Sequence, residues 1–354
     1  MISLCMIVKN EENNISKCFE SLNEVISEIV VVDTGSTDAT KNIVLKYTNR
    51  LYDYKWENDF SKARNYCIEK AKNDWILVLD ADEVIVDFNQ NKIKDFILFK
   101  EDTIGRINIV NVFNDNNFVK KYSARVGRLF NRKNYIFEGK VHEQLVKKGL
   151  KDIQTDDVDI VIEHYGYDKK LFDIDKKLKR NIDLLKYEIN NRKHDAYLYY
   201  QLGKSYYMAA EFKNSALEFE KAIKYINKFD YDYVEDLIET YGYALINTGD
   251  YKKALDVLQY EKYFENSSDF IFLQALVFMN NGLFDMAVNS FKKATCFKTS
   301  KMEGVNSYLA YYNLGVIYEC LGMLSEAIYY YNLCGDFNMA KNRLNNLIAN
   351  NEVI

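Results

Sequence analysis

The N-terminal part of the chain alternates between short apolar runs and segments with helical spacing of apolar residues. The apolar runs are short and rich in β-branched residues, which is the pattern of buried strands. Between them, apolar residues fall on one face of each segment, as Ile15, Phe19 and Leu22 do. Strands that alternate with helices predict a parallel sheet built from right-handed βαβ units. The expected strands are residues 2–8, 28–33, 51–54 and 75–80, and the expected helices are 11–22, 37–47 and 59–72.

The next segment, residues 83–165, is less regular. Four stretches have strand character, namely 104–113, 125–130, 141–146 and 158–163. They predict a mixed extension of the first sheet, with loops that are able to complete a site. The fold class expected for this half is therefore α/β, a mixed sheet with helices on both faces.

From about residue 169 onward the pattern is helical, and small and aromatic residues recur at matched positions. Small residues let two helices approach closely, and an aromatic residue fills the gap between them. The spacing resembles the tetratricopeptide repeat, a helix–turn–helix unit of about 34 residues. We expect a first domain over 1–168, a connecting helix over 169–192 and an all-α repeat domain over 193–354. The matched sets are Gly242, Gly249, Tyr251 and Ala254; Ala275, Gly282, Phe284 and Ala287; Gly315, Gly322, Leu324 and Ala327; and a looser copy with Leu202, Gly203, Tyr206, Phe219 and Ala222.

Composition narrows the class of protein. The net charge of -5 argues against non-specific nucleic-acid binding, so no nucleic-acid partner is expected. The sequence lacks an apolar run of about 18 residues, so no membrane span is predicted. The N-terminus has neither a basic region nor a cleavage-type site and is predicted to be a strand. The 6 cysteines show no metal-ligand spacing and fit buried small hydrophobes in a reducing compartment, which predicts a cytoplasmic protein.

The most informative stretch is Ile-Leu-Val-Leu-Asp-Ala-Asp-Glu at residues 76–83. It is an apolar strand that ends in two carboxylates, Asp80 and Asp82. If the backbone stays extended, both side chains project to the same side, at the carboxyl end of the strand, where open α/β sheets bind ligands. Two such carboxylates repel each other unless a cation or hydrogen-bond donors compensate. A divalent metal that carries a phosphorylated ligand is the economical explanation.

Two further segments have the residues for ligand binding. Asp33 ends a run of valines and needs a partner, which favours contact with a nucleobase or ribose. Ser36 and Asp38, which follow it, are better explained as cap and dipole partners of the next helix. Arg64 lies at the start of another helix, which Asp59 is expected to cap, and offers a fork of donors for a carboxylate or nucleotide. Taken by itself, Arg64 is better interpreted as a surface arginine paired with Glu57 or Asp59.

Together these motifs resemble the inverting family 2 glycosyltransferases of the GT-A fold. The resemblance rests on Val8-Lys-Asn10-Glu11, VVDTGSTD at 31–38, DFSKARN at 59–65 and LDADE at 79–83, in family order and spacing. Within the family it is strongest to bacterial enzymes whose catalytic domain precedes tetratricopeptide repeats. These include peptide S-glycosyltransferases of glycocin biosynthesis and lipopolysaccharide-core β-glucosyltransferases. One departure is Thr34, where many relatives carry a second acid.

The resemblance implies roles for individual residues. Asp33 and Arg64 would contact the nucleobase, and Asp80 would hold the ribose or a metal-bound water. Asp82 would ligate Mg²⁺ or Mn²⁺, which bridges the phosphates of the donor, and His164 is a candidate extra metal ligand. The donor site would thus contain Val8, Asn10, Glu11, Asp33, Arg64 and Asp80.

Inverting transfer also needs a general base opposite the leaving group. We choose Glu143 for this role, with His142 orienting it or the acceptor. The alternative is that His142 and His164 are hydrogen-bonded structural residues.

The expected function is metal-dependent transfer of a hexose from a UDP-sugar, with inversion, to an acceptor. A peptide or protein acceptor is favoured because concave repeat surfaces commonly bind peptides, and a lipid-linked or cell-surface glycan is the alternative. The repeats would recruit the acceptor or hold a second subunit in a homodimer. A non-catalytic repeat scaffold is a rival, which the intact Asp80, Asp82 and Arg64 oppose. A nucleotidyltransferase is a second rival, but Lys9-Asn10-Glu11-Glu12 lacks the Gly-rich basic loop of that class.

Overall fold

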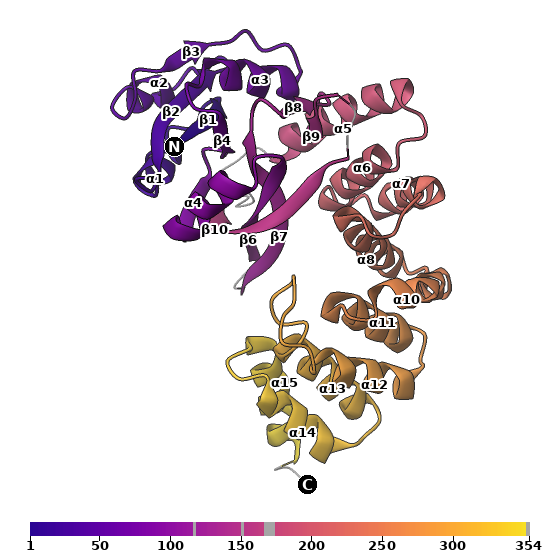
Figure 1. Cartoon of the computed structure of the whole chain (residues 1–354). Helices are drawn as coiled ribbons and strands as arrows, with labels where there is room; N and C mark the ends of the chain where they lie inside the picture. The colour runs from indigo at the N-terminus through magenta and orange to yellow at the C-terminus, as the bar shows by residue number, and fades with distance from the viewer. Residues whose placement is uncertain (116–117, 150–151, 166–173, 352–354) are drawn as a thin grey trace. The chain divides into compact units, whose positions relative to one another are not determined.

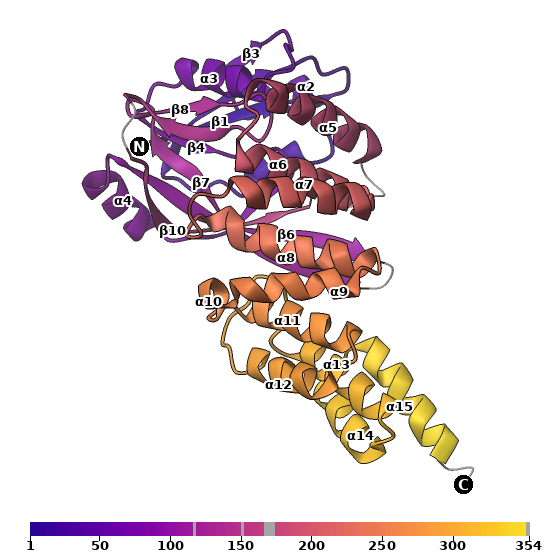
Figure 2. The ribbon, with the colours of Figure 1, turned by 90° about the vertical axis from the view of Figure 1, so that its right-hand side faces the viewer.

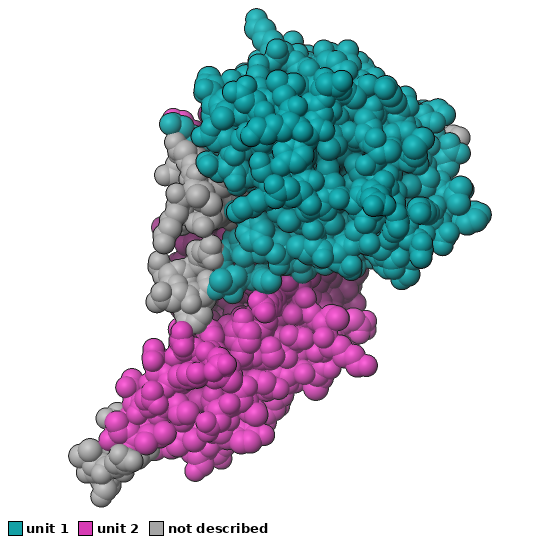
Figure 3. Space-filling model, turned by 90° about the vertical axis from the view of Figure 1, so that its left-hand side faces the viewer, with its two compact units in different colours: residues 1–177 teal, residues 178–354 magenta. Residues whose placement is uncertain are grey.

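The computed structural model describes residues 1–115, 118–149, 152–165 and 174–351. The chain divides into two compact units, residues 1–177 and 178–354, which are coloured separately in Figure 3. The boundary expected at residue 168 and the first residues of the expected connecting helix lie outside the described residues. The described part of that helix is α5 (Ile174–Asn191).

The described residues of the first unit form an eight-stranded mixed sheet with the order β3-β2-β1-β4-β7-β6-β10-β5 (Figure 1). Strands β1 to β4 run parallel to one another, as the βαβ pattern predicts. Strand β7 is antiparallel to both β4 and β6, and β10 is parallel to β6 but antiparallel to β5. The predicted α/β fold with a mixed extension is confirmed. The strands are β1 (Ile2–Val8), β2 (Ile26–Asp33), β3 (Leu51–Asp53), β4 (Trp75–Val78), β5 (Glu83–Phe88), β6 (Thr103–Asp115), β7 (Phe118–Asn131) and β10 (Gln154–His164).

Helices cover both faces of this sheet, and strand β1 shows why. Its alternate residues enter two different cores, because successive side chains of a strand point to opposite faces. Leu4 and Met6 belong to the core that includes residues of α1 (Ile15–Glu20), α2 (Thr40–Val44) and α4 (Gln90–Phe99). Cys5 belongs to the core on the other face, with α3 (Phe60–Lys70) and the hairpin of β8 (Tyr135–Glu138) and β9 (Gln144–Lys147).

Several element boundaries differ from the sequence prediction. Strand β4 ends at Val78, two residues before the expected end, and the first two helices are shorter than the ranges 11–22 and 37–47. The physical reason for the short helices is that the two loops before them bond to each other. The backbone N–H of Thr37 donates to the Asn10 side chain at 2.8 Å, and that of Ala39 donates to the Glu12 carboxylate at 2.8 Å.

Three elements of the first unit were not predicted, and one was displaced. Strand β5, helix α4 and strand β8 lie in ranges for which the sequence pattern predicted nothing. Helix α4 begins after Asn89, whose side chain accepts a hydrogen bond from the Lys92 N–H. The strand expected over 141–146 is β9 (Gln144–Lys147), because residues 139–143 turn between β8 and β9.

The second unit is all-helical, and its helices follow one another in chain order (Figure 2). In three helix pairs, a glycine in the left-handed conformation follows the first helix. The φ values are +77° at Gly249, +73° at Gly282 and +72° at Gly322. Within the described ranges, no helix combines the length and apolarity needed to cross a bilayer. The helices are α6 (Ala196–Met208), α7 (Phe212–Tyr225), α8 (Asp232–Asn247), α9 (Tyr251–Ala254), α10 (Glu261–Phe264), α11 (Ser268–Asn280), α12 (Phe284–Ala294), α13 (Tyr308–Cys320), α14 (Leu324–Leu333) and α15 (Asn338–Asn351).

The small residues of the repeat have the role that the sequence predicted. A Cβ on Gly203 would lie 2.6 Å from the Phe219 ring, and one on Gly315 would lie 2.5 Å from the Tyr331 ring. Each glycine therefore lets an aromatic side chain of the following helix pack against its backbone. The helical repeats are thus tetratricopeptide-like in both spacing and packing.

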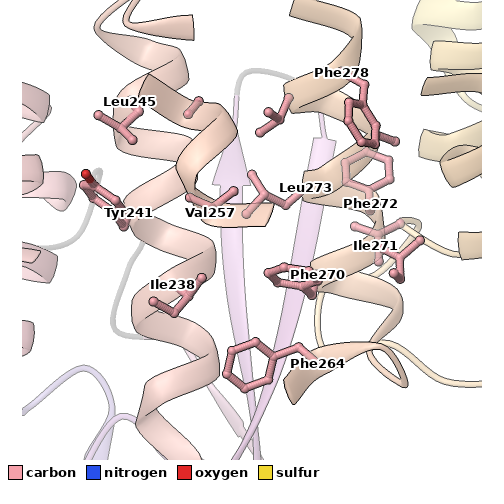
Figure 4. Packing of buried hydrophobic residues seen from close by; sticks show 14 of the residues in the cluster. Ile238, Tyr241, Leu245, Val257, Phe264, Phe270, Ile271, Phe272, Leu273 and Phe278 are labelled. Atoms are coloured by element: carbon pink, nitrogen blue, oxygen red, sulfur yellow. The ribbon is translucent and has the colours of Figure 1, made fainter. Parts of the chain in front are cut away.

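One repeat departs from the pattern in its second helix. After α9, residues Leu255–Tyr260 form a 3₁₀ helix, and α10 then completes the segment. Apolar side chains on both sides of this break still share one core, which Figure 4 shows around Val257, Phe264 and Leu273. Helix α11 contributes buried residues on all sides, including Phe270, Ile271 and Phe272, so it is the central helix of this core.

Candidate active site

The candidate site residues lie where β1, β2 and β4 end. These three strands are parallel, so their carboxyl ends meet at one edge of the sheet. The loop after β1 carries Asn10 and Glu11, and Val8 is buried at the strand end with its carbonyl oxygen 2.9 Å from the Thr34 N–H. Asn10 has a left-handed φ of 56°, which turns this loop back toward the loop after β2. The predicted donor-site residues Val8, Asn10 and Glu11 therefore share one region with Asp33.

Asp33 is the last residue of β2 and is only 1% exposed. Its Oδ1 accepts the N–H groups of Gly35 and Ser36, both at 2.9 Å, and Lys41 Nζ lies 3.6 Å from the same oxygen. Its Oδ2 is buried and has no hydrogen-bond partner among the described residues. A buried carboxylate oxygen without a donor is costly, so a ligand N–H or O–H there would lower the free energy.

The structure separates the interpretations of Ser36 and Asp38. Asp38 lies just before α2 and accepts the Thr40 N–H at 3.0 Å and the Thr40 hydroxyl at 2.6 Å, but the N-cap residue of α2 is Ala39, so neither Ser36 nor Asp38 caps the helix. Ser36 instead accepts the Asn10 N–H at 3.0 Å, so its hydroxyl joins the two loops.

Asp80 and Asp82 do not sit on a continuous extended strand. The Glu83 N–H donates to the Asp80 carbonyl oxygen at 3.1 Å, so residues 80–83 form a turn after β4. As a result the two carboxylates have different partners. Asp80 Oδ1 accepts from Arg64 at 3.0 Å and Oδ2 from Arg128 at 3.2 Å. Burial opposes the charged carboxylate, but the two guanidinium groups hold the pKa of Asp80 well below its ordinary value.

Arg64 is not the surface arginine that its local sequence favours. Its side chain is 9% exposed and pairs with Asp80 and with Glu143, to which its Nε donates a short hydrogen bond. Glu57 pairs with Lys62 instead, at 3.1 Å, and Asp59 caps α3 by accepting the Lys62 N–H at 3.0 Å. The expected pairing of Arg64 with Glu57 or Asp59 is therefore wrong, because α3 turns Arg64 inward to the strand ends.

Asp82 lies beside His164, the last residue of β10. The Asp82 Oδ2 and His164 Nε2 atoms are 3.3 Å apart, and His164 Nδ1 shares a hydrogen bond of 2.9 Å with the Asn111 side-chain oxygen. Burial disfavours the imidazolium, but the hydrogen bond to Asp82 and the nearby carboxylates outweigh it and raise the pKa of His164. The fold thus brings together the two predicted metal ligands, which are far apart in the sequence.

Sequence reasoning missed two members of this cluster, Arg128 and Glu83. Glu83 is 2% exposed, and its carboxylate accepts from Arg128 at 3.0 Å and from the Asp80 N–H at 2.8 Å. Burial, with Asp80 close by, raises the pKa of Glu83 to about 7 against the opposing effect of Arg128. The only sequence signal for them was that three carboxylates in four positions need compensating cations.

Glu143 and His142 lie in the segment between β8 and β9. The Glu143 side chain is 11% exposed, and one of its oxygens is held by Arg64. His142 has a left-handed φ of 51°, and its carbonyl oxygen accepts from the Gln144 side chain at 3.1 Å. The predicted base therefore belongs to the same charged cluster as Asp80.

Glu11 is a further acid at this edge of the sheet. The pKa of Glu11 is raised to about 6, mainly because the side chain is buried. The hydrogen bond from Asn14 opposes this shift, and the charges of Asp82 and Asp80 add to it. Its backbone N–H donates to the Thr40 hydroxyl at 2.7 Å.

The donor set fits a divalent ion only in part. Asp82 and His164 offer one carboxylate oxygen and one imidazole nitrogen, which lie 3.3 Å apart, whereas both Asp80 oxygens are paired with arginines. Within the described ranges, no group of three or more His, Cys, Asp or Glu side chains is arranged to hold a metal. An ion here would take its other ligands from water and from a bound phosphate group.

Comparison with known proteins agrees with this geometry. Residues 3–142 match the model of glycosyl transferase family 2. The chain is 33% identical over 221 residues to a TPR repeat-containing protein of Synechococcus elongatus, over 57% of this chain and 51% of that protein. It is 32% identical over 196 residues to the SPbeta prophage-derived glycosyltransferase SunS of Bacillus subtilis, over 52% of this chain and 44% of SunS. It is also 29% identical over 108 residues to the lipopolysaccharide core biosynthesis glycosyltransferase LpsC of Rhizobium meliloti, over 29% of this chain and 40% of LpsC.

The chain spans about half the length of the first two of these relatives. The family match covers the strands, loops and helix that hold Asp33, Arg64, Asp80 and Asp82, and it ends at His142. The chain therefore carries a glycosyl transferase family 2 domain, which tetratricopeptide-like helical repeats follow.

Proposed function

We propose that this protein is a metal-dependent, inverting glycosyltransferase that moves a hexose of the glucose or N-acetylglucosamine type from a UDP-sugar to an acceptor. The observation that carries the proposal is the meeting of Asp33, Asp80 and Asp82 at the ends of parallel strands, with His164 3.3 Å from Asp82. This edge of the sheet would supply the acceptors for a nucleoside and the ligands for an ion.

Different residues would bind different parts of the donor. Asp33 would accept hydrogen bonds from the nucleobase, through the oxygen that lacks a partner here. Asp80, held by Arg64 and Arg128, would face the ribose or a metal-bound water. Asp82 and His164 would hold Mg²⁺ or Mn²⁺, and the ion when bound would offset the charge of the departing diphosphate.

Glu143 is the proposed general base, with His142 as its neighbour in the same segment. In this role Glu143 takes the proton of the attacking acceptor group. The contact with Arg64 fixes one carboxylate oxygen, so the other oxygen, Oε2, would face the acceptor. Arg64 would then link the donor residue Asp80 to the base.

A peptide or protein side chain is the proposed acceptor. The support is the helical repeat unit, because concave repeat surfaces commonly bind extended peptides. The second candidate is a glycan of lipopolysaccharide type, and the similarity to LpsC favours it. The repeats could serve either acceptor, or hold a second copy of the chain.

A screen of nucleotide sugars with Mn²⁺ tests the donor half of the proposal. We expect at least one UDP-hexose to raise the melting temperature and to release UDP slowly with water as acceptor. Stimulation of UDP release by peptides rather than by glycans would identify the acceptor class. If no UDP-sugar stabilises the protein or releases UDP, the proposal fails.

A further inference from the structure

Arg128 is a largely enclosed cation of the site that the family motifs do not include. It lies on β7, which runs antiparallel to β4, and its side chain is 13% exposed. From there its Nη2 donates to Asp80 Oδ2 at 3.2 Å and to Glu83 Oε1 at 3.0 Å. A strand of the mixed extension thus contributes directly to the turn that carries the metal motif.

Arg128 is one member of a ladder of alternating charge. The order is Glu143, Arg64, Asp80, Arg128 and Glu83, and each neighbouring pair is hydrogen-bonded. Asp80 is the central member, and each of its two oxygens has a guanidinium of its own. A carboxylate held at both oxygens cannot rotate without breaking an ion pair, so its direction is fixed before any ligand arrives.

The ladder is not arranged for stability alone. The Nε of Arg128 and the Nη1 of Arg64 are buried and have no hydrogen-bond partner among the described residues. Buried donors of charged groups are costly when unpaired, and such atoms concentrate at functional sites. The arginines therefore keep positions that serve Asp80 at the expense of their own hydrogen bonds.

We propose that Arg128 is a positioning residue of the donor site, which fixes the Asp80 carboxylate in the direction needed to bind a nucleoside diphosphate. This inference rests on the proposed function. The competing explanation is structural: Arg128 would only neutralise the buried carboxylate of Glu83. The two explanations predict different behaviour when the Glu83 charge is also removed.

The test is calorimetric binding of UDP in the presence of Mn²⁺ to the full chain and to its variants. Arg128→Met removes both ion pairs, and we expect UDP binding to weaken by about 10- to 100-fold, by analogy with the loss of an outer partner at metal sites. In the double variant Arg128→Met/Glu83→Gln the buried charge of Glu83 is gone, and the glutamine oxygen still accepts the Asp80 N–H. We expect the melting temperature to recover while UDP binding stays weak.

Two further variants help to separate the positioning role from the structural explanation. Arg128→Lys keeps the charge but not the planar fork, so partial recovery of binding is expected. Arg125→Met is the matched control, since Arg125 lies on the same strand, is 44% exposed and faces Asp157 at 3.7 Å; its UDP affinity should equal that of the wild type. Wild-type affinity in the double variant would overturn the positioning role alone. Absence of UDP binding to the wild type would instead overturn the proposed function, and the inference with it.

Discussion

Both units of this chain bury clusters of charged side chains, but the two clusters are completed in different ways. In the second unit, Lys301 lies between Glu235 and Glu239, with N–O distances of 3.0 Å to each. Asp269 accepts the backbone N–H groups of Lys301 and Met302 at 2.9 and 2.7 Å. These bonds fasten the long connection between α12 and α13 to α8 and α11.

In the first unit, two atoms of the ladder around Asp80, Arg64 Nη1 and Arg128 Nε, have no hydrogen-bond partner among the described residues, and neither does Asp33 Oδ2 at the end of β2. A cluster whose polar atoms all find partners within the protein stabilises the fold, whereas one that leaves buried atoms unsatisfied is kept for another reason. Burial of charge alone therefore does not identify a ligand site. The two clusters differ in this respect, since the buried atoms without a partner in the described part of the chain include Arg64 Nη1 and Arg128 Nε but no atom of Lys301, Glu235, Glu239 or Asp269.

The largest expected effect is the loss of the base. Glu143→Gln keeps the shape of the side chain but removes its capacity to accept a proton. We expect sugar transfer to fall by roughly 10²- to 10⁴-fold, the usual contribution of general-base catalysis. UDP affinity, measured by calorimetry, should change little. Transfer at the wild-type rate would exclude Glu143 as the base.

The next effect concerns the metal. Asp82→Asn removes the charge of the proposed metal ligand, and we expect metal-dependent UDP release to fall by at least about 100-fold, since even outer partners of a metal contribute up to that much. Titration with Mn²⁺ should show the loss, and circular dichroism should show an unchanged fold. Asp87, an exposed acid on β5, offers the control Asp87→Asn, which should keep wild-type release. Full activity of Asp82→Asn would remove Asp82 from the metal site.

How far the sequence predicts this site depends on how far apart in the sequence the contacting residues lie. Asp33, Asp80 and Asp82 were predictable, since each follows an apolar strand and the strand pattern is local. Arg128 was not, because its role requires β7 to pair antiparallel with β4, and no local pattern encodes that pairing. The burial of Arg64 and the short α1 were missed for the same reason: long-range bonds override local preference.

A third prediction concerns the structural cluster of the second unit. Lys301→Met leaves Glu235 and Glu239 without their cation, and we expect a loss of about 3 kcal/mol of stability, the low end for one-sided removal of a buried pair because Lys301 is 27% exposed. The measurement is urea unfolding followed at the helical signal. UDP release below the melting temperature should not change. The control is Lys298→Met, an exposed lysine of the same connection. A stability equal to that of the wild type would mean that Lys301 does not stabilise the attachment of this connection to α8.

The smallest expected effects test the turns between the repeat helices. Gly249 has a φ of +77°, and an added Cβ would meet no atom within 4 Å, so Gly249→Ala should cost about 1 kcal/mol from backbone strain alone. In the first repeat, Ala210 has a φ of +59° between α6 and α7. Ala210→Gly should therefore stabilise by roughly 0.5 kcal/mol, as strain relief exceeds the added entropy of the unfolded chain. Thermal unfolding of the two variants compares them directly, and changes of the opposite signs would contradict the assignment of matched turns.

The central claim is that the first unit, through the site around Asp80 and Asp82, transfers sugar from a UDP donor with inversion. Its most direct test is proton NMR of the sugar first released from UDP-α-glucose or UDP-α-N-acetylglucosamine, with Mn²⁺ and with water as acceptor. We predict that UDP and the β-anomer appear together, before mutarotation mixes the anomers, and that neither appears with Asp82→Asn. Initial release of the α-anomer, or no metal-dependent release of UDP from any UDP-hexose, would contradict the claim.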